Sequence, residues 1–229
     1  MGPFLSLIYN INNIHMVTLE DLQAYCKGKK IIIVGNCFDL LNNKHGSLID
    51  NYEIVVRINR GYQYRKHLYD EYIGSKTTIL SLGVQTAAQA TRIIEGNSVN
   101  YILSPIIYSE TLDYPNVYDV SQDTYNTLKK SLGDTKPSTG ISTFNFFNRF
   151  IDFERLDLIG FDFFESSVLQ TNQLGHIKVL EHDGSKERSF FWKTCDPDKT
   201  TLHETNGASA TPTTTINNIP RHSRNNQFF

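Results

Sequence analysis

Two asparagines are the residues best placed to bind a ligand, because each follows a short apolar run. Residues 31–34 and 54–58 are rich in isoleucine and valine, which is typical of short buried strands. Gly35 and Asn36 come directly after the first run, and Asn59 follows the second. Ligands bind outside the carboxyl ends of the strands in an open α/β sheet, so Asn36 and Asn59 can hold one ligand together. Taken singly, each is also an ordinary turn residue.

A second polar cluster, residues 136–140, precedes the aromatic run 141–153. The phenylalanines of this run recur at helical spacing, which predicts a largely buried helix. Pro137 prevents the helix from extending upstream, and Ser138 or Thr139 can cap its start. The backbone N–H groups at such a start form a site for anions, although an ordinary helix cap explains the same residues.

A third pair, His182 and Glu187, lies directly before and within a helix predicted over residues 185–193. The spacing, histidine followed by four residues and a glutamate, is weak by itself. A surface histidine, and a glutamate that caps the helix, would account for it.

Taken in this order, the three clusters resemble the sialyl motifs of glycosyltransferase family 29, the sialyltransferases. The long motif is matched by Val34-Gly35-Asn36, by Gly46 with Ile49-Asp50, and by Val55, Arg57 and Asn59. The short motif is matched by Pro137-Ser138-Thr139-Gly140, a helix, a strand and Gly160-Phe161, and the very short motif by His182 with Glu187. The bacterial family 42 sialyltransferases are similar more distantly, through a comparable strand–Gly-Asn–strand opening.

The resemblance implies a GT-A-like, Rossmann-type domain that uses a CMP-activated 2-keto sugar acid, either sialic acid or Kdo. Asn36 and Asn59, with Gly35 at the same turn, would hold the phosphate and ribose of the nucleotide. Ser138, Thr139 and Gly140 would receive the donor carboxylate or the cytidine, and these six residues are the expected substrate-binding residues.

The resemblance also assigns the catalytic residues of an inverting, in-line displacement in which CMP leaves. His182 would be the general base that deprotonates a hydroxyl of a glycan or glycolipid acceptor, and an imidazole titrates near the working pH. Glu187 would orient the imidazole ring or cap the helix. We expect no metal and no cofactor, because no Asp-x-Asp sequence follows a predicted strand.

Some positions depart from the family pattern. Cys37 and Phe38 replace small residues, the cysteines of the two main motifs are missing, and Ser166 and Ser167 stand where a His-Tyr-Tyr motif is expected. The missing motif favours one alternative, an inactive sialyltransferase-like module that binds a nucleotide or a glycan. A second alternative, a dinucleotide-dependent Rossmann enzyme, lacks the glycines of its fingerprint here.

Composition excludes several other classes. The 229 residues suffice for one α/β domain, and a net charge of −2 without long basic blocks argues against nucleic-acid binding. The three widely spaced cysteines suggest neither a disulfide framework nor a zinc site. Residues 1–17 are too short and too polar for a transmembrane segment, and they lack the features of a signal peptide. We expect a cytoplasmic protein of a microbe or a virus, either free or peripheral to a membrane.

Strands that alternate with helices predict an α/β fold, a mostly parallel sheet with helices on both faces. We expect a single catalytic domain over residues 1–199, followed by a Thr/Asn-rich tail or lid over 200–229. Helices are expected at 18–27, 85–95 and 124–132, with a helical turn near Leu40 and a loop at 106–120. Further strands are expected at 77–82, 101–103 and 156–160.

Overall fold

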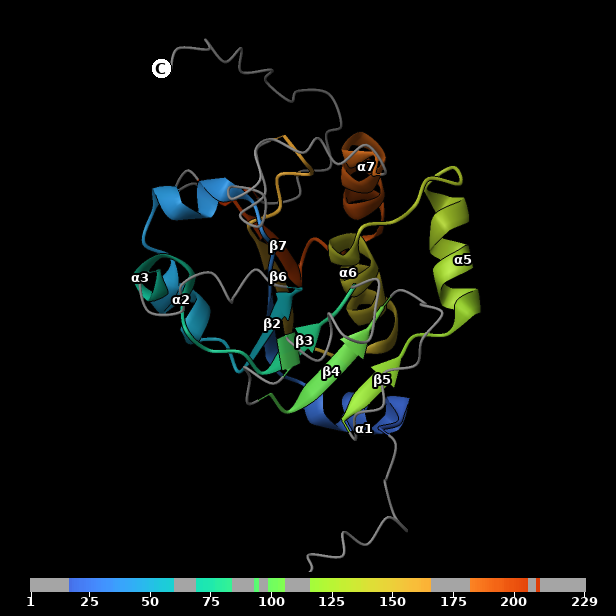
Figure 1. The fold of residues 1–229 in the computed structure, drawn as a ribbon, viewed down its shortest axis with the longest axis horizontal. Helices are drawn as coiled ribbons and strands as arrows, with labels where there is room; N and C mark the ends of the chain where they lie inside the picture. The colour runs from blue at the N-terminus through green and yellow to red at the C-terminus, as the bar shows by residue number, and fades with distance from the viewer. Residues whose placement is uncertain are drawn as a thin grey trace, which may run out of the picture.

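The computed structural model describes residues 17–59, 69–83, 93–94, 99–105, 116–165, 182–205 and 209–210. Within them one sheet has eight strands in the order β5-β4-β3-β2-β1-β6-β7-β8 (Figure 1). The strands are β1 (Lys30–Val34), β2 (Ile54–Ile58), β3 (Ile79–Ser81), β4 (Tyr101–Ser104), β5 (Val117–Asp119), β6 (Arg155–Ile159), β7 (Thr200–His203) and β8 (Ser209–Ala210). All neighbours pair in parallel except β7 and β8, which are antiparallel.

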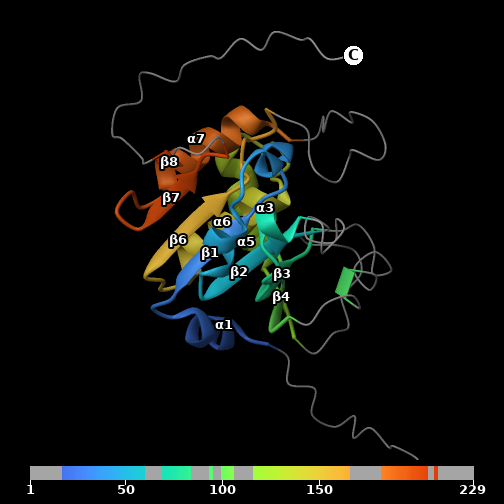
Figure 2. The same ribbon diagram turned by 90° about the vertical axis from the view of Figure 1, so that its left-hand side faces the viewer.

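Helical segments cover both faces of the sheet (Figures 1 and 2). They are α1 (Leu19–Cys26), η2 (Phe38–Asn42), α2 (Gly46–Asp50), α3 (Asp70–Ile73), α5 (Gln122–Ser131), α6 (Thr139–Phe150) and α7 (Gly184–Thr194). The core on one face combines the sheet with side chains of α1, α5, α6 and α7. The opposite face packs against η2, α2 and α3. The predicted α/β fold, a mostly parallel sheet with helices on both faces, is confirmed.

Apolar burial explains the centre of the sheet. Ile31, Ile32 and Ile33 of β1 are fully buried, because both faces of this strand are covered. β1 lies between β2 and β6, and the order of the strands reverses at the β1–β6 pair. A crevice at such a switch point is the usual ligand site of an open α/β sheet, so the fold places residues 35–36 and 160–161 at that position.

The expected strand boundaries agree with the structure to within two residues for β1, β2, β3, β4 and β6. The predicted first helix is also present, and a capping box fixes its start: Thr18 Oγ1 accepts from Asp21 N, and Thr18 N donates to the Asp21 carboxylate. Of the helix predicted at 85–95, only residues 93–94 lie inside the described part, and they are helical.

Three strands differ from the predictions. β5 lies inside the expected loop at 106–120, β7 begins where we expected the domain to end, and β8 lies within the expected tail. Thr200 and Thr201 are buried in the sheet. Threonine is β-branched and fits a strand as well as a polar tail, so composition alone did not distinguish the two. The sheet domain therefore continues beyond residue 199. Residues 211–229 of the expected tail or lid lie outside the described residues.

A buried carboxylate on β6 holds β7 in register. Asp157 is 1% exposed, accepts a hydrogen bond from Thr201 N at 2.9 Å and lies 3.2 Å from His203 Nε2. Burial raises the pKa of Asp157, but hydrogen bonds from His203, Tyr52 and Arg155 outweigh burial and hold the pKa below its usual value. Asp157 and Thr201 lie inside their strands and His203 is the last residue of β7, so these contacts explain why the Thr-rich segment joins the sheet.

No helix in the described ranges combines the length and the apolar character that crossing a bilayer requires.

Candidate active site

The two strand-end asparagines meet at the carboxyl edge of the sheet. Asn36 Nδ2 donates to the carbonyl oxygen of Ile58, the last residue of β2, at 3.1 Å. Asn59 takes a left-handed backbone conformation, φ 51°, which asparagine tolerates better than most residues. Its Oδ1 accepts from Gly83 N at 2.6 Å, and its Nδ2 donates to Thr139 Oγ1 at 3.3 Å. Asn59 thereby ties the ends of β2 and β3 to the start of α6.

The start of α6 confirms the predicted cap. Ser138 is the N-cap, and its Oγ accepts from Ile141 N at 3.2 Å. The backbone N–H groups of Thr139 and Gly140 make no hydrogen bond with any other described residue. Two N–H groups at the positive end of a 12-residue helix are therefore available to an anion at this edge.

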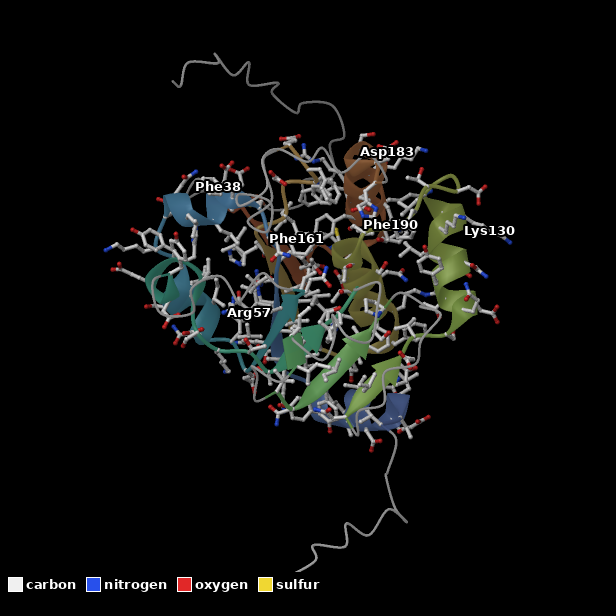
Figure 3. All side chains as sticks on the ribbon, viewed as in Figure 1. Phe38, Arg57, Lys130, Phe161, Asp183 and Phe190 are labelled. Atoms are coloured by element: carbon white, nitrogen blue, oxygen red, sulfur yellow. The ribbon has the colours of Figure 1, made fainter. Side chains whose placement is uncertain are left out.

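Three glycines allow the segments of this edge to approach each other closely. A Cβ on Gly35 would lie 2.3 Å from the carbonyl oxygen of Gly160, and one on Gly83 would lie 1.9 Å from Thr139 Oγ1. A Cβ on Gly140 would lie 2.8 Å from the ring of Phe161, which sits between the strand ends and α6 (Figure 3). Gly35 and Gly140 thus shape the site by leaving room for their neighbours.

Replacing Gly35 with alanine should lower the free energy of unfolding by about 3 kcal/mol, the upper end of ordinary overpacking costs. The clashing atom is a backbone oxygen of the adjacent strand end, so no side-chain rotation relieves it. Urea denaturation measures the loss. Gly28→Ala is the control, because a Cβ there meets no atom within 4 Å and only its φ of 65° opposes the change. Wild-type stability of Gly35→Ala would contradict the close approach of β1 and β6.

The middle residues of the long motif serve the scaffold. Asp50 accepts from the backbone N–H groups of Ser75 and Lys76, and Arg57 donates to the carbonyl oxygen of Ile73 at 2.8 Å. Arg57, the residue before the last of β2, is 2% exposed, and its guanidinium is engaged by the carbonyl oxygens of Ile73 and Lys76. These residues fix the connection between α3 and β3. The motif therefore divides into a scaffold part and a strand-end part.

Glu187 contacts Ser138 and not the imidazole of His182, so the prediction that Glu187 orients His182 is wrong. Its Oε1 accepts from Ser138 N at 2.7 Å and its Oε2 from Ser138 Oγ at 2.8 Å. The alternative, that it caps its own helix, is also wrong, because Asp183 is the N-cap of α7. Glu187 lies on the first turn of α7, which faces the start of α6. There it engages the polar groups of Ser138 that we expected to meet a ligand.

Burial governs the protonation of Glu187. The side chain is 3% exposed, and desolvation raises its pKa from 4.5 to about 7, although hydrogen bonds from Ser138 partly oppose this shift. The carboxyl group of Glu187 therefore keeps its proton to a higher pH than a solvent-exposed glutamate does.

His182 lies beside the same helix start, immediately before α7. Its Nδ1 is 2.9 Å from the carbonyl oxygen of Lys136, and its ring stacks on Phe164 with centroids 5.5 Å apart. Because a carbonyl only accepts, Nδ1 carries the proton in the neutral ring and Nε2 is the basic nitrogen. The arrangement is suited to proton transfer at the rim of the site.

The structure thus brings together Asn36, Asn59, Thr139 and Gly140. His182 lies near them, because it is hydrogen-bonded to Lys136, two residues before Ser138. Sequence reasoning missed Gly83, although a glycine just after a predicted strand is the signal that identified Gly35. The segment where the His-Tyr-Tyr motif was expected, residues 166–181, lies outside the described residues. Among the described residues no group of three histidines, cysteines or carboxylates gathers as a metal site would require.

Comparison with known proteins identifies a family and a fold for this chain. The model of glycosyltransferase family 29 (sialyltransferase) matches residues 4–157, which is well over half of the chain. A crystal structure of a mammalian sialyltransferase superposes with a TM-score of 0.52 at 17% sequence identity, over 82% of this chain and 72% of that one. A segment of 47 residues is 45% identical to the beta-1,6-galactosyltransferase GALT29A of Arabidopsis thaliana. That segment is 20% of this chain and spans only 11% of the plant protein.

Proposed function

The chain belongs to glycosyltransferase family 29, the sialyltransferase family, and we propose that it transfers a 2-keto sugar acid from a CMP conjugate to a hydroxyl of a glycan or glycolipid. The observation that carries this proposal is the junction of β1, β2 and α6, where asparagine amides and helix N–H groups face one edge. A nucleotide sugar acid has the matching chemistry, because it combines a phosphate, ribose hydroxyls and a carboxylate. Sialic acid and Kdo both fit this description.

In the proposed complex, Asn36 and Asn59 hold the phosphate and the ribose, Asn59 through the second N–H of its Nδ2, since Oδ1 and the first N–H bond to Gly83 and Thr139. The N–H groups of Thr139 and Gly140 receive the donor carboxylate, since the helix start favours negative charge. Ser138 and Gly35 shape the site, because the N–H and hydroxyl of Ser138 are engaged by Glu187 and Gly35 contacts Gly160.

The proposed reaction is a single in-line displacement. Nε2 of His182 takes the proton of the acceptor hydroxyl, and the acceptor oxygen bonds to the anomeric carbon of the sugar. The bond from that carbon to the phosphate oxygen breaks on the opposite face, and CMP leaves with the electron pair. The anomeric configuration is inverted, and the balance of atoms and charge needs neither a metal nor an oxidant.

A second candidate differs in the donor sugar. The plant protein that shares the 47-residue segment is named a galactosyltransferase, so a nucleotide-activated galactose is the competing donor. A galactose donor has no carboxylate, and the N–H groups of Thr139 and Gly140 would then contact the nucleotide phosphates.

The deciding experiment offers the purified protein CMP-sialic acid, CMP-Kdo and an activated galactose, each with a mixture of glycan acceptors, and detects product by mass spectrometry. We expect transfer from a CMP donor that persists in EDTA. Transfer of galactose alone would replace the proposed donor, and transfer that EDTA abolishes and manganese restores would overturn the metal-free mechanism. Binding of CMP without transfer from any donor would identify an inactive module.

Replacing Asn36 with alanine should weaken CMP binding roughly tenfold, the effect of losing one hydrogen bond to a ligand. Its Nδ2 contacts the carbonyl oxygen of Ile58, and its Oδ1 makes no hydrogen bond with the described residues, so the oxygen is available to the ligand. Isothermal titration with CMP measures the change. Asn148→Ala is the matched control, because Asn148 bonds to the Thr194 carbonyl at the other end of α6. Equal affinities in both variants would place the nucleotide elsewhere.

A further inference from the structure

The turn that follows β6 has an unusual backbone. Phe163 and Phe164 take positive φ values of 55° and 68°, a left-handed conformation that bulky residues rarely adopt. The two rings point to different environments, because Phe163 is buried in the core and Phe164 is 37% exposed. Two consecutive strained residues persist only where surrounding contacts impose them, and such strain concentrates at functional sites.

Arg188 of α7 supplies part of those contacts. Its guanidinium lies 5.2 Å from the ring centroid of Phe163, donates to the carbonyl oxygen of Asp162 at 3.4 Å and pairs with Glu165 at 2.9 Å. The N–H of Phe164 also donates to Asp162 Oδ1 at 3.1 Å. Residues 162–165 are therefore held against the helix that His182 precedes.

The start of α7 and this turn are packed too closely for a side chain between them. A Cβ on Gly184 would lie 1.8 Å from the carbonyl oxygen of Phe163. This approach brings the ring of Phe164 over the imidazole of His182, with centroids 5.5 Å apart and planes inclined by only 23°. The left-handed turn thus places an aromatic ring on a histidine.

We propose that Phe164 is a positioning residue for His182; this inference rests on the proposed role of His182 as the general base. The carbonyl of Lys136 holds one edge of the imidazole through Nδ1, and a single hydrogen bond does not by itself fix the plane of a ring. Stacking on Phe164 fixes the plane of the ring. The two contacts together set the direction of Nε2, the nitrogen that takes the acceptor proton.

The test compares Phe164→Ala with Phe164→Tyr, and uses Leu48→Ala as the control. Leu48 is a comparably exposed apolar residue, 39%, on α2 at the other face of the sheet. Phe164→Ala should lower kcat about ten- to a hundredfold with unchanged donor KM, because a misdirected base costs rate and not donor binding. Phe164→Tyr keeps the ring and should restore kcat, and Leu48→Ala should match wild type.

An NMR measurement on His182 decides the same question without relying on activity. A stacked phenylalanine shifts the ring protons of His182 upfield, and this shift should disappear in Phe164→Ala and remain in Phe164→Tyr. Unchanged His182 resonances in Phe164→Ala, or an unchanged kcat, would overturn the proposal. A protein that transfers no sugar but shows the predicted shifts would refute the proposed function while confirming that Phe164 positions the imidazole.

Discussion

Replacing His182 with alanine should lower kcat for sugar transfer by ~10²–10⁴-fold, the usual cost of removing a general base. The affinity for CMP should be unchanged, because the base acts on the acceptor hydroxyl and not on the donor. The hydrogen bond from Nδ1 to Lys136 O, 2.9 Å long, already sets the tautomer that makes Nε2 basic. Steady-state kinetics with titration of CMP separates the two effects, and the acidic limb of the pH–rate profile should disappear.

His45→Ala is the matched control for this experiment. His45 is the N-cap residue of α2 on the opposite face of the sheet, and its Nε2 lies 3.4 Å from the carbonyl oxygen of Thr205. Its removal should leave kcat unchanged. Near wild-type transfer by His182→Ala would assign the base to another group. Loss of CMP binding in His182→Ala would instead make His182 part of the donor site.

Replacing Glu187 with alanine should destabilise the protein by about 2–4 kcal/mol, because it leaves two buried polar groups of Ser138 without their partner. Glu187→Gln should cost much less, since the amide oxygen still accepts from Ser138 N and the amide N–H can donate to Ser138 Oγ. Urea denaturation measures both variants. Glu154→Ala is the control for removing a carboxylate: its pair with Lys30 is exposed and contributes little. Equal stability of Glu187→Ala and Glu154→Ala would contradict the brace between α6 and α7.

The raised pKa of Glu187 also gives the stability a dependence on pH. The folded protein keeps the proton up to about pH 7, whereas the unfolded chain releases it near pH 4.5. The contribution of this group to stability is complete below pH 4.5 and is lost as the pH rises through 7, by roughly 3 kcal/mol in all. The stability of wild type relative to Glu187→Gln should therefore fall between pH 5 and pH 8. A difference that stays constant over this range would show that the carboxylate is already ionised in the folded protein.

Local sequence patterns predicted an element correctly where a few neighbouring residues encode its burial or its cap. The β-branched runs of β1 and β2 predicted both strands, because a strand buried on both faces reads as a continuous apolar segment. Pro137 and Ser138 predicted the start of α6, since a cap is encoded within a few residues. β5 was missed because only Val117 of its three residues is buried. β7 was missed because its register depends on Asp157, a contact between distant segments.

The same division holds for the site. Asn36, Asn59 and the start of α6 could be predicted from local signals. An apolar run that stops at a polar residue marks a strand end, and a capping residue marks a helix start. The partner of Glu187 could not, since nothing local to residues 182–187 indicates that Ser138 lies within hydrogen-bond distance. The stack of Phe164 on His182 was equally hidden, because it depends on two left-handed residues that carry no glycine signal.

The position of β6 beside β1 has a consequence for biosynthesis. Lys30 pairs with Arg155, more than a hundred positions later, so β1 can pair with β6 only when most of the chain has left the ribosome. Until then one edge of β1, with its four consecutive apolar residues, has no partner strand, and such edges recruit other chains. Contacts of this sequence separation also form slowly. The nascent protein therefore passes through an aggregation-prone interval that lasts until β6 has been synthesised, and chaperones that hold nascent chains should raise the soluble yield.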